Sequence, residues 1–289
     1  MVLQFLINGL VTGAVYAIVS LGFAIVYNTT KILHIVYAAL FVTAPYLVFY
    51  FYKEAGLAFG ISIVLAILFT TILSVIIDLI IYKPLKRKNS SLYIYIISSL
   101  GAFIILTNVI ALFFGNELKT LQSELSNSIQ VSNIILTLNQ IIQFLISTIL
   151  ILFFLLFLKF TKFGIITRAI RDNPTLSNIF GVNTDKFRIY LFLLSGFFVA
   201  IGGILASYDI GMDPYVGMPM FVNALVALII GGIGKFHGPI IGAFILALLQ
   251  SLVIWQFSAS WENAVTFSLL IVFLILRPQG IVGEKSRAV

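Results

Sequence analysis

The sequence has no cysteine, only two histidines and few charges, since 9% of its 289 residues are Asp, Glu, Lys or Arg. The absence of cysteine excludes disulfides, thiolate nucleophiles and Cys-ligated metals, and His34 and His237 are too few for a metal centre built from imidazoles. An average soluble chain is about 25% charged, so a chain this poor in charge is not a soluble enzyme. The net charge of +7 does not indicate nucleic-acid binding, because the basic residues lie between long apolar runs, where orientation in a membrane explains them.

An ATP-binding loop is also missing. The run GGIGKF at residues 231–236 lacks the upstream glycine of such a loop and the Ser or Thr that follows its lysine. Any energy that the protein needs would therefore have to come from another polypeptide or from an ion gradient. Ion-coupled carriers place acids within their spans, and here only Asp78 qualifies. Because it lies near Lys83 at the end of an apolar run, we expect a snorkelling or paired helix-end aspartate, not a proton relay.

What the chain does contain is apolar sequence: 61% of its residues are hydrophobic, and the mean hydropathy is +1.15. Apolar runs of about 20 residues cross a bilayer as helices, because a backbone in lipid must satisfy its own hydrogen bonds. The sequence therefore predicts an all-α, polytopic membrane helix bundle with eight or nine spans, some short or broken. The candidates are residues 3–27, 32–52, 57–82, 92–114, 134–158, 189–208, 219–233, 239–257 and 261–276. The second, seventh and ninth are the weakest.

The charges predict how this bundle is oriented. With the N-terminus outside, the cytoplasmic segments hold fifteen of the seventeen Lys and Arg residues and four of the ten acids. The outside segments hold two bases and six acids, Glu262 among them. Cytoplasmic loops of membrane proteins carry an excess of Lys and Arg. We therefore expect one transmembrane domain over residues 1–289 with its N-terminus outside and its C-terminus in the cytoplasm, whether the chain has nine spans or seven.

The longest polar segment on the basic side is the loop 159–188. Its middle carries the signals of a short helix: Asn173 can cap the first turn, Pro174 suits the first helical position, and Gly181 can end the helix in a left-handed conformation. Leu176, Ile179 and Phe180 then share one face. From spacing alone, two interpretations stay open, a loop helix packed on its own bundle and a helix that docks into a partner. The flanking residues are Arg168, Ala169, Arg171 and Asp172.

The loop sequence GIITRAIRDNPTLSNIFGVNTDKF resembles the permease signature of branched-chain amino-acid ABC importers. The signature has a Gly, an Arg-Ala pair, an acidic or amide pair and a helix that ends in Gly-Val/Ile-Asn-Thr-Asp. The resemblance extends in order and spacing over nearly the whole chain, and the sequence looks like the shorter, LivH-type permease subunit. The other matching runs are INGLVTGAVYAIVSLGFAIVY, GFFVAIGGILAS, ALVALIIGGIGKFHGPIIGAFIL and LRPQGIVG. The chain departs from the family between Ile32 and Tyr37, so no substrate role is carried onto His34.

The resemblance implies a transport subunit of the prokaryotic inner membrane that catalyses no reaction of its own. It implies a second homologous permease, two cytoplasmic ATP-binding subunits that hold the ATP and magnesium, an extracytoplasmic substrate-binding protein and lipid around the bundle. In that family the loop helix is the coupling helix received by the ATPase, so the coupling region is expected at residues 168–185. The implied substrates are branched-chain or related amino acids.

The translocation path is expected near breaks in the spans. Gly231, Gly232 and Gly234 are followed by Gly238-Pro239, and such a run cannot continue a regular helix. Gly-broken segments at membrane depth are typical of transport pathways, where exposed backbone lines a cavity. Each polar candidate is also explained by an interhelical hydrogen bond. These candidates are Asn8, Thr12, Tyr16, Ser20, Thr43 and Asn223.

Other functions remain as alternatives. An ion-coupled secondary carrier or a channel would work without ATPase partners. An ABC permease for urea, short amides or sugars would share the family but not the substrate. A membrane-embedded enzyme would need a buried constellation of acids, His or Cys, which the sequence does not offer.

Overall fold

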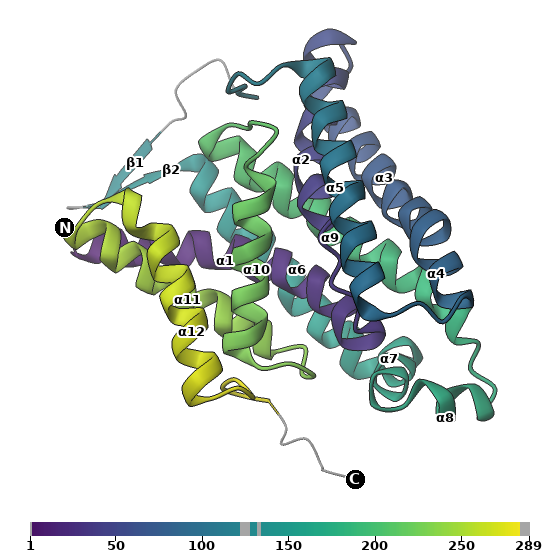
Figure 1. Ribbon diagram of the computed structural model, residues 1–289. Coiled ribbons are helices and arrows are strands. Elements are labelled where there is room, and N and C mark those ends of the chain that lie inside the picture. The colour runs from purple at the N-terminus through teal and green to yellow at the C-terminus, as the bar shows by residue number, and fades with distance from the viewer. Residues whose placement is uncertain (1, 122–127, 132–133, 284–289) are drawn as a thin grey trace. The chain divides into compact units, whose positions relative to one another are not determined.

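The computed structural model describes residues 2–121, 128–131 and 134–283, and these residues are almost entirely helical (Figure 1). Glu124, Lys285 and Arg287, which entered the charge balance, lie outside the described residues. The α-helices are α1 (Val2–Thr30), α2 (Tyr37–Phe49), α3 (Phe59–Ile77), α4 (Lys83–Arg87), α5 (Leu92–Phe114), α6 (Leu138–Phe160), α7 (Lys162–Asp172), α8 (Pro174–Ile179), α9 (Thr184–Ile210), α10 (Gly217–Gly231), α11 (Gly238–Gln256) and α12 (Glu262–Leu276). Two π-helices, η1 (Tyr50–Glu54) and η2 (Asp78–Tyr82), one 3₁₀ turn, η3 (Ala259–Trp261), and strands β1 (Ser128–Val131) and β2 (Ile134–Thr137) complete the order.

The prediction of an all-α, polytopic membrane bundle is confirmed. Seven helices of the described chain are long and apolar enough to cross a membrane, and the ninth candidate is among them. The second and seventh candidates form the shorter helices α2 and α10. The seven are Val2–Thr30, Phe59–Arg87, Leu92–Phe114, Leu138–Phe160, Thr184–Tyr208, Gly238–Gln256 and Ala259–Leu276.

The predicted span 32–52 is wrong at its start. Lys31 adopts a left-handed conformation with φ of 59°, and a helix resumes only at Tyr37. The helix then continues through Pro45, which has no N–H to give to the carbonyl of Phe41, four residues earlier. Gly203 of α9 lies against that carbonyl, because a Cβ built on Gly203 would be 2.0 Å from the Phe41 oxygen. Helices α2 and α9 therefore approach closely at the Phe41 carbonyl. This carbonyl receives no N–H from its own helix, because residue 45 is proline.

The predicted span 134–158 is also wrong at its start. Residues 134–137 form β2, which pairs antiparallel with β1 in the register Ser128↔Thr137 and Val131↔Ile134. An apolar run of four residues fits a strand as well as a helix, so periodicity could not decide between them. The side chain of Gln4 binds the same strand, accepting from the Ile135 N–H and donating to its carbonyl, both at 2.8 Å.

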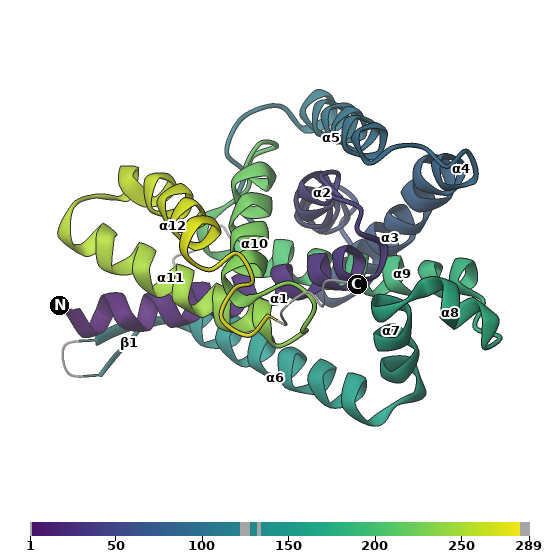
Figure 2. The same ribbon diagram turned by 60° about the horizontal axis from the view of Figure 1, so that its bottom comes forward.

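The chain divides into two compact units, and the division falls within α1, α6 and α10. Unit 1 consists of Met1–Ala24, Glu124–Leu156 and Val222–Val289. Here α11 and α12 lie side by side (Figure 2). Two glycines of α1 let it approach α11 closely: Cβ atoms on Gly9 and Gly13 would lie 3.0 Å from Ser251 and 2.8 Å from Phe244 of α11.

Unit 2 consists of Ile25–Ser123 and Phe157–Phe221. Its core is α2, which packs against α3, α5 and α9 (Figure 1). Gly196 of α9 lies against α3, where its Cβ would be 2.9 Å from the Thr71 Cα, and the Ser74 hydroxyl donates to the Phe192 carbonyl at 3.0 Å. The outer faces of α3 and α5 expose isoleucine, leucine and phenylalanine side chains, as lipid-facing helices do.

Candidate functional site

A network of polar side chains crosses unit 1 from helix to helix. Tyr16 of α1 donates from its hydroxyl to Glu262 Oε1 at 3.2 Å, and Asn223 Nδ2 of α10 donates to the Tyr16 hydroxyl at 3.0 Å. Gln250 Nε2 of α11 donates to Asn223 Oδ1 at 3.3 Å and to Thr266 Oγ1 at 2.7 Å. Thr266 of α12 also contacts Asn223 Oδ1 at 3.1 Å. Four helices are thus joined by one set of side chains, of which all but the half-buried Glu262 are buried.

The network contains two of the predicted path residues, Tyr16 and Asn223. Ser20 lies one turn further along α1 and donates to the Ala224 carbonyl at 3.3 Å. Sequence reasoning missed Gln250 and Thr266 and counted Glu262 only as an outside acid. An amide in the middle of a long apolar span was the signal that could have found Gln250, because polar groups inside spans are costly and often functional.

The other predicted path residues lie elsewhere. Asn8 accepts from the Gln4 side chain at 3.1 Å, and Thr12 is exposed. Thr43 belongs to unit 2, where its hydroxyl donates to the Ala39 carbonyl of its own helix at 2.7 Å. None of these three side chains has a hydrogen bond to the network.

The glycine break after α10 packs against the end of the described chain. Ile281 and Val282 donate their N–H groups to the carbonyls of Ile230 and Gly231 at 2.9 and 3.0 Å. Gly232 has φ of 108°, and a Cβ there would lie 2.5 Å from the Gly283 nitrogen. Gly234 has the same φ and nothing within 4 Å of an added Cβ. Close backbone packing accounts for Gly231 and Gly232, and a role of the break in the path stays a prediction.

The second candidate site is the loop 159–188, which folds as α7 and α8. Asn173 Oδ1 accepts from the Leu176 N–H at 2.9 Å, Pro174 begins α8, and Gly181 has φ of 86°. The predicted short helix and its three local signals are thus present. Asn178 Oδ1 accepts from both the N–H and the hydroxyl of Thr184, at 3.3 and 3.0 Å, and so ties α8 to α9.

The apolar face of α8 is not covered by the described chain. Leu176, Ile179 and Phe180 are 50%, 74% and 83% exposed. On α7, Arg168 donates to the Leu158 carbonyl at 2.8 Å, and Arg171 pairs with Asp172 at 2.7 Å. Ala169 lies on the same helix. The apolar face of α8 is therefore exposed in the described chain, and docking of α8 into a partner stays a prediction.

The loop also affects Lys31, at the end of α1. Partial burial and the neighbouring Arg171 guanidinium lower the pKa of Lys31, and the Asp172 carboxylate partly offsets them. The left-handed residue that follows α1 and the end of α7 therefore share one electrostatic environment.

A comparison with known proteins identifies the family. The sequence model of the family described as branched-chain amino acid transport system / permease component matches residues 5–275. The chain belongs to this family. Members are permease subunits of ABC transporters, which lack ATPase activity, and they are multi-pass proteins of the bacterial inner membrane. Among the described residues, no group of three or more His, Asp or Glu side chains could hold a metal ion.

Individual relatives differ in the share of the chain that they match. The high-affinity branched-chain amino acid transport system permease protein LivH of Escherichia coli is 27% identical, covering 98% of this chain and 96% of LivH. The autoinducer 2 import system permease protein LsrC of Yersinia pseudotuberculosis is 33% identical over 40% of this chain and 35% of LsrC. A chain of PsaBC from Streptococcus pneumoniae, solved in complex with Fab, is similar in fold, with a TM-score of 0.51 and 16% identity over 96% of this chain and 93% of that chain.

Proposed function

We propose that this chain forms the translocation path of an ATP-driven importer for branched-chain or related amino acids, acting as one transmembrane domain beside a second homologous permease. The full-length similarity to LivH supports this substrate class, whereas the similarity to LsrC covers less than half of each chain. Urea, short amides and sugars remain alternative substrates within the same family. An ion-coupled carrier does not fit a family of ABC permease subunits.

The coupling proposal rests on one observation, the uncovered apolar face of a capped two-turn helix. Ile179 and Phe180 are 74% and 83% exposed at the end of α8, on the face opposite Asn178. Such a surface is costly to leave in water, and it has the dimensions of a helix that docks into a groove. We assign the receiving groove to a cytoplasmic ATP-binding subunit, which would hold the ATP and magnesium, so that this chain needs no cofactor of its own.

The polar network of unit 1 is the proposed wall of the path. Its hydroxyl and amide groups offer donors and acceptors to a passing zwitterion, and its apolar neighbours offer contact to an aliphatic side chain. Alternating access would expose this wall to either side of the membrane in turn. On the outside, a substrate-binding protein would deliver the amino acid. Selection among amino acids would then rest largely with that binding protein.

Reconstitution tests the proposal. Proteoliposomes that hold this chain, its partner permease, both ATPases and the binding protein should accumulate radiolabelled leucine only when ATP is present at the ATPase side. Proteoliposomes that hold this chain alone should show no uptake. Equal uptake by this chain alone would contradict the proposal and would favour a carrier or channel.

A further inference from the structure

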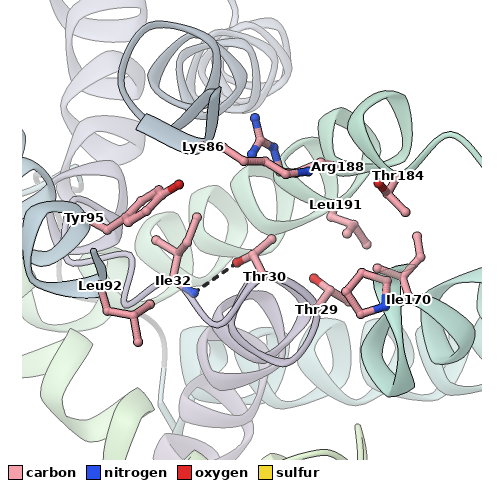
Figure 3. A pocket seen from close by; sticks show the side chains of 11 residues that line it. Thr29, Thr30, Ile32, Lys86, Leu92, Tyr95, Ile170, Thr184, Arg188 and Leu191 are labelled. Atoms are coloured by element: carbon pink, nitrogen blue, oxygen red, sulfur yellow. Dashed lines mark hydrogen bonds between the residues drawn. The ribbon is translucent and has the colours of Figure 1, made fainter. Parts of the chain in front are cut away.

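Unit 2 contains a cavity of about 280 Å³ near the ends of several helices (Figure 3). Its lining comes from the last turn of α1, from α4, from the start of α5, from the α7–α8 junction and from the start of α9. None of these residues belongs to the polar network of the proposed path. The cavity is therefore a separate site, and its chemistry can be derived from its own side chains.

Arg188 is the residue that gives this cavity a specificity. Its side chain is 6% exposed, and its Nε donates to Asp78 Oδ2 at 3.2 Å. A guanidinium carries five N–H donors in a planar fork. Among the residues that the structure describes, the terminal nitrogens of Arg188 make no hydrogen bond to protein, and the residue lines the cavity. A buried arginine with unused donors is suited to a carboxylate or phosphate, which it binds through two parallel hydrogen bonds.

Two further donors line the same cavity from other helices. Tyr95 of α5 is buried, and its hydroxyl makes no hydrogen bond to any described residue. Lys86 of α4 lies beside Arg188 in Figure 3, and its ammonium contacts Asp185 at 2.6 Å. The two charged side chains that line the cavity are both cations, Lys86 and Arg188. Each pairs with a carboxylate outside the lining, Asp185 and Asp78, so what the cavity offers an anion is the unused N–H donors of Arg188.

The rest of the wall is mainly apolar. Ile32, Leu92, Ile170 and Leu191 line it opposite or beside the donors (Figure 3). The hydroxyls of Thr29 and Thr30 already donate to the carbonyls of Ile25 and Val26, both at 2.7 Å, so they offer acceptors but no further proton. The cavity thus has a cationic end for an oxyanion and an apolar remainder for hydrocarbon.

We propose that this cavity binds an oxyanion attached to a short apolar group. Its volume is near the lower end of the about 300–1,000 Å³ that ligand pockets occupy, which suits one small ligand or one headgroup with the first part of its chain. The same chemistry is offered by the phosphate of an acidic phospholipid and by the carboxylate of an apolar amino acid. Because Ile170 and Pro174 line the cavity together with Thr30, the bound molecule bridges the loop 159–188 to the end of α1.

The test measures binding to the purified full chain in nanodiscs of phosphatidylcholine. One arm titrates a short-chain phosphatidylglycerol, and the other titrates L-leucine, with native mass spectrometry and the apparent Tm as readouts. We expect saturable, one-to-one binding in one arm, which identifies the source of the oxyanion. Absence of saturable binding in both arms would overturn the proposal.

Variants separate this site from general lipid contact. Tyr95→Phe removes a hydroxyl that makes no hydrogen bond to described residues, so the chain should fold as before and bind about tenfold more weakly. Arg188→Lys keeps a charge opposite Asp78 but not the fork, and binding should fall further. Tyr93→Phe, on the same helix but 78% exposed, is the matched control and should bind like the parent chain. Equal binding by Tyr95→Phe and Tyr93→Phe would also overturn the proposal.

Discussion

Arg188 at the start of α9 and Asp78 at the start of η2 are 110 residues apart and form a buried ion pair, with 3.1 Å between the Arg188 Nε and Asp78 Oδ1. Their side chains are 6% and 1% exposed. The sequence predicted that Asp78 would be a snorkelling or paired helix-end aspartate. It is paired, and its partner is a distant arginine, so the pair joins the end of one long helix to the beginning of another.

Breaking this pair should destabilise the protein strongly. Arg188→Ala leaves the Asp78 carboxylate buried without its partner, and such losses cost about 3–5 kcal/mol. The double variant Asp78→Asn, Arg188→Leu removes both charges and should recover most of the apparent Tm. Differential scanning fluorimetry in detergent measures both. The exposed pair of Lys86 with Asp185 is the control, and Lys86→Ala should cost no more than about 1 kcal/mol. A double variant as unstable as Arg188→Ala would contradict the uncompensated charge as the cause.

Charge on the apolar face of α8 should prevent binding of the ATPases. Ile179→Asp and Phe180→Asp place a carboxylate where the proposed groove is apolar, and both side chains are exposed, so the permease itself should fold with an unchanged Tm. Co-purification of the ATPases with tagged permease is the measurement, and we expect recovery to fall at least tenfold.

The matched control for α8 is Asn178→Asp. It adds the same charge on the opposite face of the helix and keeps the oxygen that accepts from Thr184. ATPase recovery should remain at the parent level for this variant. Parent-level recovery with Ile179→Asp and Phe180→Asp as well would show that α8 is not the docking helix.

Local features were predictable from the sequence, and features built from several helices were not. The cap at Asn173, the start at Pro174 and the left-handed Gly181 depend on neighbouring residues, so a short window contains the whole signal. The network was predictable only in part, because Tyr16, Asn223, Gln250 and Thr266 come from four helices.

The same distinction explains the errors at the starts of two spans. Hydropathy alone extended the second span back to residue 32 and the fifth back to residue 134. The first error depends on the backbone conformation at Lys31, and the second on pairing of β2 with β1. Neither a left-handed residue nor a strand partner changes the hydropathy of a run. The correct start of each of these two spans could therefore be found only from the three-dimensional structure.

Two glycine substitutions should have opposite effects on stability. In Gly203→Ala the new Cβ would lie 2.0 Å from the Phe41 carbonyl oxygen, so α2 and α9 must separate, at a cost of about 1–3 kcal/mol. In Gly101→Ala nothing lies within 4 Å of the new Cβ, and alanine is the better helix former by up to about 1 kcal/mol. The apparent Tm should fall in the first variant and rise slightly in the second. A parent-like Tm for Gly203→Ala would mean that the two helices do not approach as closely as described.

Removal of the Tyr16 hydroxyl should slow transport more than it lowers stability. Tyr16→Phe breaks the contact with Glu262 and leaves Asn223 Nδ2 without its acceptor, a loss of about 1–1.5 kcal/mol that we expect as a roughly tenfold fall in leucine uptake. Tyr46→Phe is the control, because the Tyr46 hydroxyl is buried and makes no hydrogen bond within the described chain. If Tyr16→Phe lowers the Tm but leaves uptake at the parent level, the network holds helices together and is not part of the translocation path.

The orientation predicted from the charges can be tested directly, because the chain has no native cysteine. Ser90→Cys lies between α4 and α5, on the predicted cytoplasmic side, and Ser258→Cys lies between α11 and α12, on the predicted outside. A membrane-impermeant maleimide added to intact spheroplasts should label Ser258→Cys and should label Ser90→Cys only after the membrane is permeabilised. The Lys and Arg excess makes this the expected result. The reverse pattern would place α8 outside the cell, away from any ATP-binding subunit, and would exclude the coupling role with it.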